Sequence, residues 1–225
     1  PGIRSDSDLY TFGYRFKPWT GAPIATSEEI LNYMGEVIAE NDLDQHIRYG
    51  QQVTDAQWSS SSRRWTLTVT DKASGRQWTV TAGFLWMCQG YYNHRHGYTP
   101  TWPGMEKFQG QIVHPQQWPD DLDYQDRSVV VIGSGATAAS HVTMLQRSPT
   151  YFSTGRNANA LADTLRELEI DETWIHEIVR KKILFDQARI VERSTAEPEA
   201  LKSELLQGAR KYLGPDFDLD THFTP

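Results

Sequence analysis

The 225-residue sequence has little cysteine, no long apolar run and no excess of basic residues. Its single cysteine, Cys88, excludes an internal disulfide framework and a cysteine-based zinc site, and is typical of a reducing cytosol. No apolar run approaches the roughly 20 residues of a membrane helix, and no signal peptide opens the chain, so we expect a cytoplasmic protein without an integral membrane segment. Lys and Arg total 22 against 29 Asp and Glu, which argues against nucleic acid as a partner. Small-molecule chemistry is the default that remains.

Hydrophobic residues make up 38 % of the chain and aromatic residues 12 %, which predicts a folded protein. The chain begins at Pro1 and not at Met, which we interpret as the middle of a longer protein.

The first half of the chain shows three patterns of hydrophobicity. Residues 1–19 have no clear period and are predicted to form a loop. Residues 27–40 are predicted to form a helix with one apolar face, made by Ile30, Leu31, Met34, Val37 and Ile38. Alternation between residues 47 and 80 predicts an antiparallel meander of three strands. The continuous apolar run 84–88 predicts a strand buried on both faces in a parallel sheet.

The second half begins with a connector, residues 91–126, rich in Pro, Gly, His and Trp. Buried strands are predicted over residues 128–132 and 142–145, and we expect them to be parallel neighbours. After Arg156 the pattern is helical to the end, which indicates a helical subdomain.

A glycine motif follows the strand 128–132 directly. Gly133, Gly135 and Ala138 have the Gly-x-Gly-x-x-Ala spacing that lets a pyrophosphate approach the backbone at a helix N-terminus. A plain strand-to-helix turn is the alternative reading. At the end of the next strand stand Arg147 and Ser148, and no acid, which favours the 2′-phosphate of NADP over the free ribose of NAD. The alternative for Arg147 is a solvated charge.

The spacing after this motif conflicts with the geometry of parallel strands. A parallel crossover needs about a dozen residues, yet only Ala139, Ser140 and His141 separate Ala138 from the strand that starts at Val142. We therefore predict that Ser140 and His141 lie far apart, well beyond the roughly 3.8 Å between Cα atoms joined by a trans peptide. If they are joined, the nucleotide site is broken.

The connector also holds a spaced motif of aromatic residues around a histidine. A lone histidine between aromatic residues is most often a structural hydrogen-bonder. Here, however, the spacing Phe-x-Gly-x-x-x-His-x-x-x-Trp-Pro resembles the fingerprint of the class B flavin-dependent monooxygenases, the group of the Baeyer–Villiger and flavin-containing monooxygenases. Residues 1–10, 90–93, 114–119, 131–138 and 142–151 are similar to a mycobacterial branch of the same family. The fingerprint residues are Phe108, Gly110, His114, Trp118 and Pro119.

This resemblance implies an oxidoreductase in which NADPH reduces bound FAD. Oxygen then reacts to give a C4a-peroxyflavin, which oxygenates a ketone or a sulfur centre. It implies an α/β fold with Rossmann-like FAD and NADP domains, an antiparallel meander and a helical subdomain. The expected divisions are residues 1–100 for part of the FAD domain, 101–126 for the connector, and 127–225 for the NADP domain with a helical insertion.

The resemblance also implies roles for particular residues. Arg4 and Asp6 would be catalytic, and with Ser5 would lie beside flavin and nicotinamide, where Asp6 would orient a further arginine; a turn cap is the alternative for Asp6. Val53 would contact the adenosine side of FAD, and His114 and Trp118 would belong to a hinge between the nucleotide domains. The NADP-binding set would be Gly133, Ser134, Gly135, Ala136, Thr137, Ala138, Ala139, Ser140, Arg147 and Ser148.

Three parts of the family pattern are missing from the sequence: the first FAD-binding glycine motif, the crossover helix after Ala138, and a catalytic arginine expected after Pro225. Two alternatives therefore stay open. One is a catalytically inactive nucleotide-binding fragment. The other is a flavin disulfide reductase, which would need a redox-active cysteine pair where the chain has only Cys88.

Overall fold

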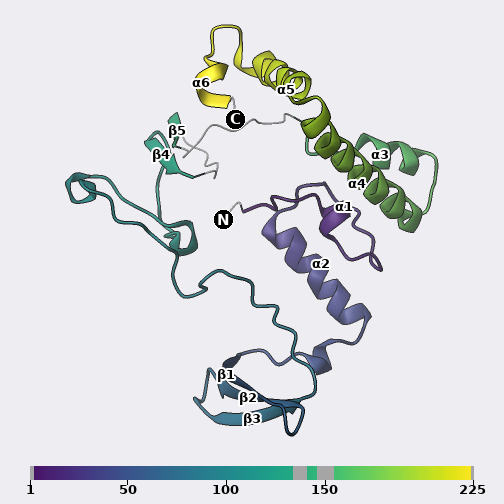
Figure 1. The fold of residues 1–225 in the computed structure, drawn as a ribbon, viewed down its shortest axis with the longest axis vertical. Helices are drawn as coiled ribbons and strands as arrows, with labels where there is room; N and C mark the ends of the chain where they lie inside the picture. The colour runs from purple at the N-terminus through teal and green to yellow at the C-terminus, as the bar shows by residue number, and fades with distance from the viewer. Residues whose placement is uncertain (1–2, 134–140, 146–154, 224–225) are drawn as a thin grey trace. The chain divides into compact units, whose positions relative to one another are not determined.

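The computed structural model describes residues 3–133, 141–145 and 155–223 of the chain (Figure 1). By the contacts between Cα atoms, the chain divides into two compact units. Unit 1 combines Pro1–Ile47 with Gln146–Pro225, and unit 2 is Arg48–Leu145.

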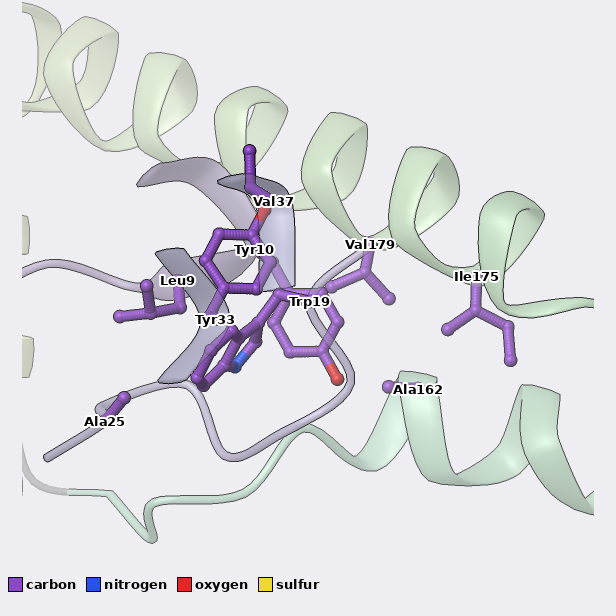
Figure 2. Close-up of a cluster of buried hydrophobic side chains, with 9 residues drawn as sticks. All are labelled: Leu9, Tyr10, Trp19, Ala25, Tyr33, Val37, Ala162, Ile175 and Val179. Carbon is purple, nitrogen blue, oxygen red and sulfur yellow. The ribbon is translucent and has the colours of Figure 1, made fainter. Parts of the chain in front are cut away.

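Unit 1 is helical, and its core joins the two ends of the chain. Its longer helices are α2 (Ser27–Glu40), α3 (Ala160–Glu167), α4 (Glu172–Ala196) and α5 (Pro198–Leu213), with the short helices α1 (Leu9–Phe12), η1 (Asp44–His46) and α6 (Leu219–Phe223). Figure 2 shows side chains from α1 and α2 meeting those of α3 and α4. The cluster consists of Leu9, Tyr10, Trp19, Ala25, Tyr33, Val37, Ala162, Ile175 and Val179. The helical subdomain expected after Arg156 is thus confirmed, and the first 47 residues pack onto it.

The prediction that residues 1–19 form a loop is wrong, because this segment contains α1 and three buried side chains. Asp8 caps α1 by accepting the backbone N–H of Tyr10 at 2.9 Å, which starts the helix although its sequence has no helical period. Leu9, Tyr10 and Trp19 are buried. Contacts with a helix more than 150 residues away cannot be read from local periodicity.

The helix α2 has the predicted bounds, Ser27–Glu40, but only part of the predicted apolar face is covered: Val37 is buried and Ile30 packs, partly buried, against the core. Tyr33 and Val37 are buried, whereas Leu31 and Met34 are exposed. The Tyr33 hydroxyl accepts the N–H of Tyr14 at 2.9 Å and donates to the carbonyl of Lys17 at 2.8 Å. These hydrogen bonds turn the tyrosine inward, so the helix is rotated away from the purely aliphatic face.

Two arginines tie α3 and α4 to the N-terminal segment. Arg166 pairs through Nε with Glu172 at 2.6 Å and donates through Nη2 to the Tyr10 hydroxyl at 3.1 Å. The bond to Glu172 raises the pKa of the Arg166 guanidinium. Arg180 donates from Nη1 to the carbonyl oxygens of Tyr10, Thr11 and Gly13, at 3.2, 2.7 and 3.2 Å. Both cations contact Tyr10, Arg166 at its hydroxyl and Arg180 at its carbonyl oxygen.

His176 is the buried polar side chain of unit 1, with 1 % of its surface exposed. Its Nδ1 accepts the backbone N–H of Trp19 at 3.3 Å, and Nε2 has no partner among the described residues. Burial lowers the pKa of this imidazole, and the nearby Arg180 lowers it further against the opposite pull of Glu177. His176 is therefore neutral in the folded unit.

A loss of stability on mild acidification follows from this neutral histidine. In the unfolded chain His176 protonates near its ordinary pKa, about 6.5, whereas the folded state resists protonation. The free energy of unfolding of unit 1 should therefore be highest above that pH and should decline as the pH falls through it. Urea unfolding at about pH 7.5 and about pH 5.5, followed by Trp fluorescence, measures the decline. His176→Gln should flatten it, and His46→Gln, on the exposed helix η1, should not. If the free energy of unfolding fell equally in the parent and in His176→Gln between the two pH values, this role of His176 would be contradicted.

Unit 2 contains the predicted meander, with strands β1 (Gln51–Ser59), β2 (Arg64–Asp71) and β3 (Gln77–Ala82) in the antiparallel order β1-β2-β3 (Figure 1). Cross-strand pairing puts three apolar rows on one face of the sheet and Thr and Gln residues with Asp55 on the other. The apolar rows are Val53–Val69–Trp78, Ala56–Leu67–Val80 and Trp58–Trp65–Ala82. The turn after β2 is fixed by Asp71, whose carboxylate accepts the N–H and hydroxyl of Ser74, and these bonds lower the pKa of Asp71 to about 2.

Unit 2 also contains the predicted parallel pair, β4 (Ser128–Ile132) and β5 (His141–Leu145). Their register runs from Ser128 opposite His141 to Ile132 opposite Leu145. The pair is less buried than predicted, because Val130 and Ile132 are more than half exposed. Two strands make this sheet in the described residues, and the face of β4 that carries Val130 and Ile132 is exposed there.

The prediction that residues 84–88 form a buried strand is wrong. These residues form no strand, and Phe84 and Trp86 are 76 % and 79 % exposed. A strand exists only where a neighbouring strand satisfies its backbone, and no neighbour pairs with this run in the described residues. The connector that follows contains only the short turns η2 (Met105–Lys107) and η3 (Pro115–Gln117). None of the helices in the described ranges is both long and apolar enough to span a bilayer.

Candidate functional site

The segment that holds Arg4, Ser5 and Asp6 is fixed to the residues before α2. Ser27 donates its N–H to the Ile3 carbonyl at 3.0 Å, and Ser5 donates its N–H to the Ala25 carbonyl at 2.8 Å. The Ser5 hydroxyl accepts the N–H of Ala25 at 3.1 Å. Arg4 pairs with Thr26 in an isolated antiparallel bridge. The backbone of this segment is thus ordered by hydrogen bonds that leave the side chains of Arg4 and Asp6 exposed.

A capping box at the start of α2 supports the other side of this bridge. Thr26 is the N-cap: its hydroxyl accepts the N–H of Glu29, and the Glu29 carboxylate accepts the N–H of Thr26 at 2.7 Å. These bonds, with a smaller contribution from the charge of Arg4, lower the pKa of Glu29. The Thr-x-x-Glu spacing is the signal that identifies this cap in the sequence.

Asp8 differs from Asp6 in its surroundings. Asp8 is half-buried, and burial raises the pKa of its carboxyl despite the N–H that it accepts from Tyr10. The turn-cap role considered for Asp6 is therefore filled by Asp8. Asp6 is exposed and makes no hydrogen bond or ion pair with another described residue, so its carboxylate is free to act on something outside the segment.

Val53 lies in β1 at an irregularity of the meander. The register shifts between Val53 and Asp55, so that Thr54 is bulged and has no cross-strand partner residue. The bulge returns Val53 to the apolar face, opposite Val69. Among the described residues β1 is an edge strand of this sheet, and Val53 is 54 % exposed there.

Gly133 ends β4 with a positive φ of 121° and donates its N–H to the carbonyl of Leu145 at 3.0 Å. A β carbon built at Gly133 would meet no atom of the described residues within 4 Å. The positive φ is the conformation that favours glycine at a tight strand-to-loop turn. The remaining predicted NADP residues, 134–140 with Arg147 and Ser148, lie outside the described residues, and so does the predicted separation of Ser140 from His141.

The fingerprint residues lie in the connector, where aromatic rings pack on glycine. The Phe108 ring covers Gly110: a β carbon built there would be 2.5 Å from the ring, which explains the Phe-x-Gly spacing sterically. Trp118 packs edge-on against Tyr124, with ring centroids 5.6 Å apart. His114 caps η3 by accepting the N–H of Gln116 at 3.1 Å.

The structure therefore brings Arg4, Ser5 and Asp6 together in unit 1, and it places Val53, Gly133 and the fingerprint residues on separate elements of unit 2. The described residues contain no cluster of three or more His, Cys, Asp or Glu side chains suited to a metal ion. Cys88 is exposed and unpaired with another cysteine.

Known proteins similar to this chain agree on one family. The model of the flavin-binding monooxygenase-like family matches residues 23–158. The FAD-containing monooxygenase EthA of Mycolicibacterium smegmatis is 43 % identical over 237 aligned positions, which cover 100 % of this chain and 48 % of the relative. The chain thus spans about half the length of this curated relative. Since the alignment is longer than the 225 residues of the chain, the relative has about a dozen residues without a counterpart here.

Solved structures of similar fold are also flavin monooxygenases. A crystal structure of cyclohexanone monooxygenase with ε-caprolactone bound matches with a TM-score of 0.55 and 25 % identity, over 76 % of this chain and 35 % of that one. The complex of OTEMO with FAD and NADP matches with a TM-score of 0.51 and 26 % identity, over 74 % and 35 %. The expected fold class is confirmed by these neighbours. The chain therefore belongs to the flavin-binding monooxygenase-like family.

Proposed function

We propose that this chain is part of an FAD- and NADPH-dependent monooxygenase that transfers one oxygen atom of O2 to a ketone or to a sulfur centre. The observation that carries the proposal is the match of the whole chain to an FAD-containing monooxygenase. The cyclohexanone monooxygenase among the structural neighbours favours a ketone, and hence a Baeyer–Villiger insertion. By the same proposal the protein is cytoplasmic, and residues 1–100, 101–126 and 127–225 correspond to the FAD part, the connector and the NADP part.

The chain's own residues fit the two nucleotides. The bulged edge at Val53 and Thr54 exposes main chain that a planar adenine could bind. At Gly133, which has a positive φ and no side chain, a phosphate group could approach the backbone closely. Arg147 and Ser148 would accept the 2′-phosphate of NADP, and residues 134–140 would surround the pyrophosphate.

When bound, FAD supplies the oxygen chemistry: with two electrons from NADPH, one atom of O2 enters the substrate and the other leaves as water. The chain contributes position and charge. Arg4 provides a cation where negative charge develops, and Asp6 provides a carboxylate that can hold a second cation in place. The hydrogen bonds between residues 3–5 and 25–27 keep both side chains at a fixed point of the backbone.

The test is an assay of NADPH oxidation by the full-length protein with FAD, in the presence and absence of cyclohexanone or a thioether. We expect substrate-dependent NADPH consumption and a product heavier by one oxygen, labelled when 18O2 is supplied. Nucleotide binding without a labelled product would contradict the proposal and favour the inactive nucleotide-binding fragment.

A preference for NADPH over NADH is the more specific expectation. Arg147→Ala removes a charge-assisted contact with the 2′-phosphate, worth about 1.5–3 kcal/mol, so the Kd for NADPH should rise about 10- to 150-fold while that for NADH stays unchanged. Titration calorimetry with both nucleotides measures this. Arg156→Ala is the matched control, because Arg156 is an exposed arginine nearby in the sequence. Equal affinity of the parent protein for NADH and NADPH would rule out the assignment.

A further inference from the structure

Gly97 lies against the imidazole of the fingerprint histidine. A β carbon built at Gly97 would lie 1.9 Å from Cε1 of His114 and 2.2 Å from both ring nitrogens. All three nearest atoms belong to this one ring. No real side chain fits at such distances, so the ring occupies the space that any other residue at position 97 would need.

The backbone at Gly97 gives no other reason for glycine. Its φ lies outside the left-handed region, unlike that of Gly90 and Gly104 in the same connector. Gly97 therefore lacks the left-handed φ that strains an alanine. The requirement at position 97 is therefore for space and not for conformational freedom.

The His114 ring is oriented by a hydrogen bond to the turn that it caps. Its Nδ1 accepts the N–H of Gln116 at 3.1 Å, which caps the turn η3. The Gln116 side chain in turn donates to the carbonyl of Asn93 at 3.0 Å. We call these four residues, Asn93, Gly97, His114 and Gln116, the His114 clasp. It joins two stretches of the connector across a ring contact and a side-chain hydrogen bond.

We propose that Gly97 is a positioning residue for His114. It lets the imidazole pack directly on the main chain, and so sets where the fingerprint histidine and the turn η3 stand. This inference rests on the proposed function only for its effect on turnover. The clasp itself is a property of the connector and can be tested without activity.

A structural test uses the tautomer of His114. Since Nδ1 accepts a hydrogen bond, the neutral ring carries its proton on Nε2. In 15N-histidine spectra of the full-length protein, the His114 signal should show the Nε2–H tautomer. Gly97→Ala should displace the ring and give a mixture of tautomers. Gly83→Ala is the matched control, because a β carbon at Gly83 meets nothing within 4 Å and its φ is also outside the left-handed region. An unchanged His114 signal in Gly97→Ala would overturn the proposal.

A functional test uses the double variant. Displacement of a positioned group by about 1 Å can cost ~100-fold in rate, so Gly97→Ala should lower kcat about 10- to 100-fold. If the damage passes through the ring, adding Gly97→Ala to His114→Ala should cost nothing further. Multiplied losses in the double variant would overturn the proposal. If the parent protein shows no turnover, the proposed function fails, while the spectra still decide on the clasp.

Discussion

Replacing Asp6 by alanine in the full-length protein should lower kcat for oxygen transfer about 100- to 1000-fold, the loss expected when an electrostatic group of the reaction centre is removed. The proposed role of Asp6 is to hold a cation where negative charge develops. Its carboxylate is exposed and makes no bond within the described residues, so the fold does not depend on it. The segment is held through the backbone of Ile3 and Ser5. The melting temperature should therefore be unchanged.

Two variants sharpen this test. Asp6→Asn keeps the shape and removes the charge, so it should lose nearly as much activity as Asp6→Ala. Asp44→Ala removes an exposed acid of the same unit outside the segment, and should keep full activity. A kcat for Asp6→Ala within about threefold of the parent, far less than an electrostatic role requires, would show that Asp6 has no catalytic role.

Replacing Arg180 by methionine should cost about 3–4 kcal/mol in the free energy of unfolding of unit 1. The guanidinium satisfies the carbonyls of Tyr10, Thr11 and Gly13, which end the helix α1. Hydrogen bonds from a charged donor contribute about 1.5–3 kcal/mol, and carbonyls left without a partner add to the loss. Methionine keeps most of the aliphatic packing, so the change isolates the polar contacts. Urea unfolding with Trp fluorescence measures the effect.

Neighbouring variants separate this role from a general effect of charge. Lys181→Met removes the next cation along α4, which is exposed, and should change stability by less than about 0.5 kcal/mol. Arg180→Lys should recover part of the loss, because one ammonium can reach some of the three carbonyls. Equal stabilities of Arg180→Met and Lys181→Met would refute the role given to Arg180.

Local patterns were sufficient where the structure depends on neighbours in the sequence. The meander follows from alternation, and its turn after β2 from Asp71 and Ser74. The bounds of α2 follow from its cap and its helical period. Which face of α2 is buried could not be predicted in this way, because the distant main chain of Tyr14 and Lys17 turns Tyr33 inward. Residues 84–88 have the composition of a buried strand but form none, because no strand in the described residues pairs with them.

Some features of the candidate site could likewise be predicted from the sequence, and others depend on the tertiary structure. Motif spacing indicated Gly133 and the fingerprint, because glycine turns and spaced aromatic residues leave a trace in the sequence. Arg4, Ser5, Asp6 and Val53 were expected from the family resemblance. That Asp8 and not Asp6 caps α1 depends on burial, and that Thr54 bulges beside Val53 depends on cross-strand register.

By itself, the sequence determined the family, the helical segment after Arg156, the meander and the two parallel strands, since each rests on residues close together in the chain. The tertiary structure alone decided what the first 47 residues do. It buried Tyr10 and Trp19 against α4 and left His176 neutral beside Arg180. It also set His114 on Gly97, 17 residues earlier in the sequence. The physical reason is that packing and charge act through space, so a contact between distant residues has no period in the sequence to announce it.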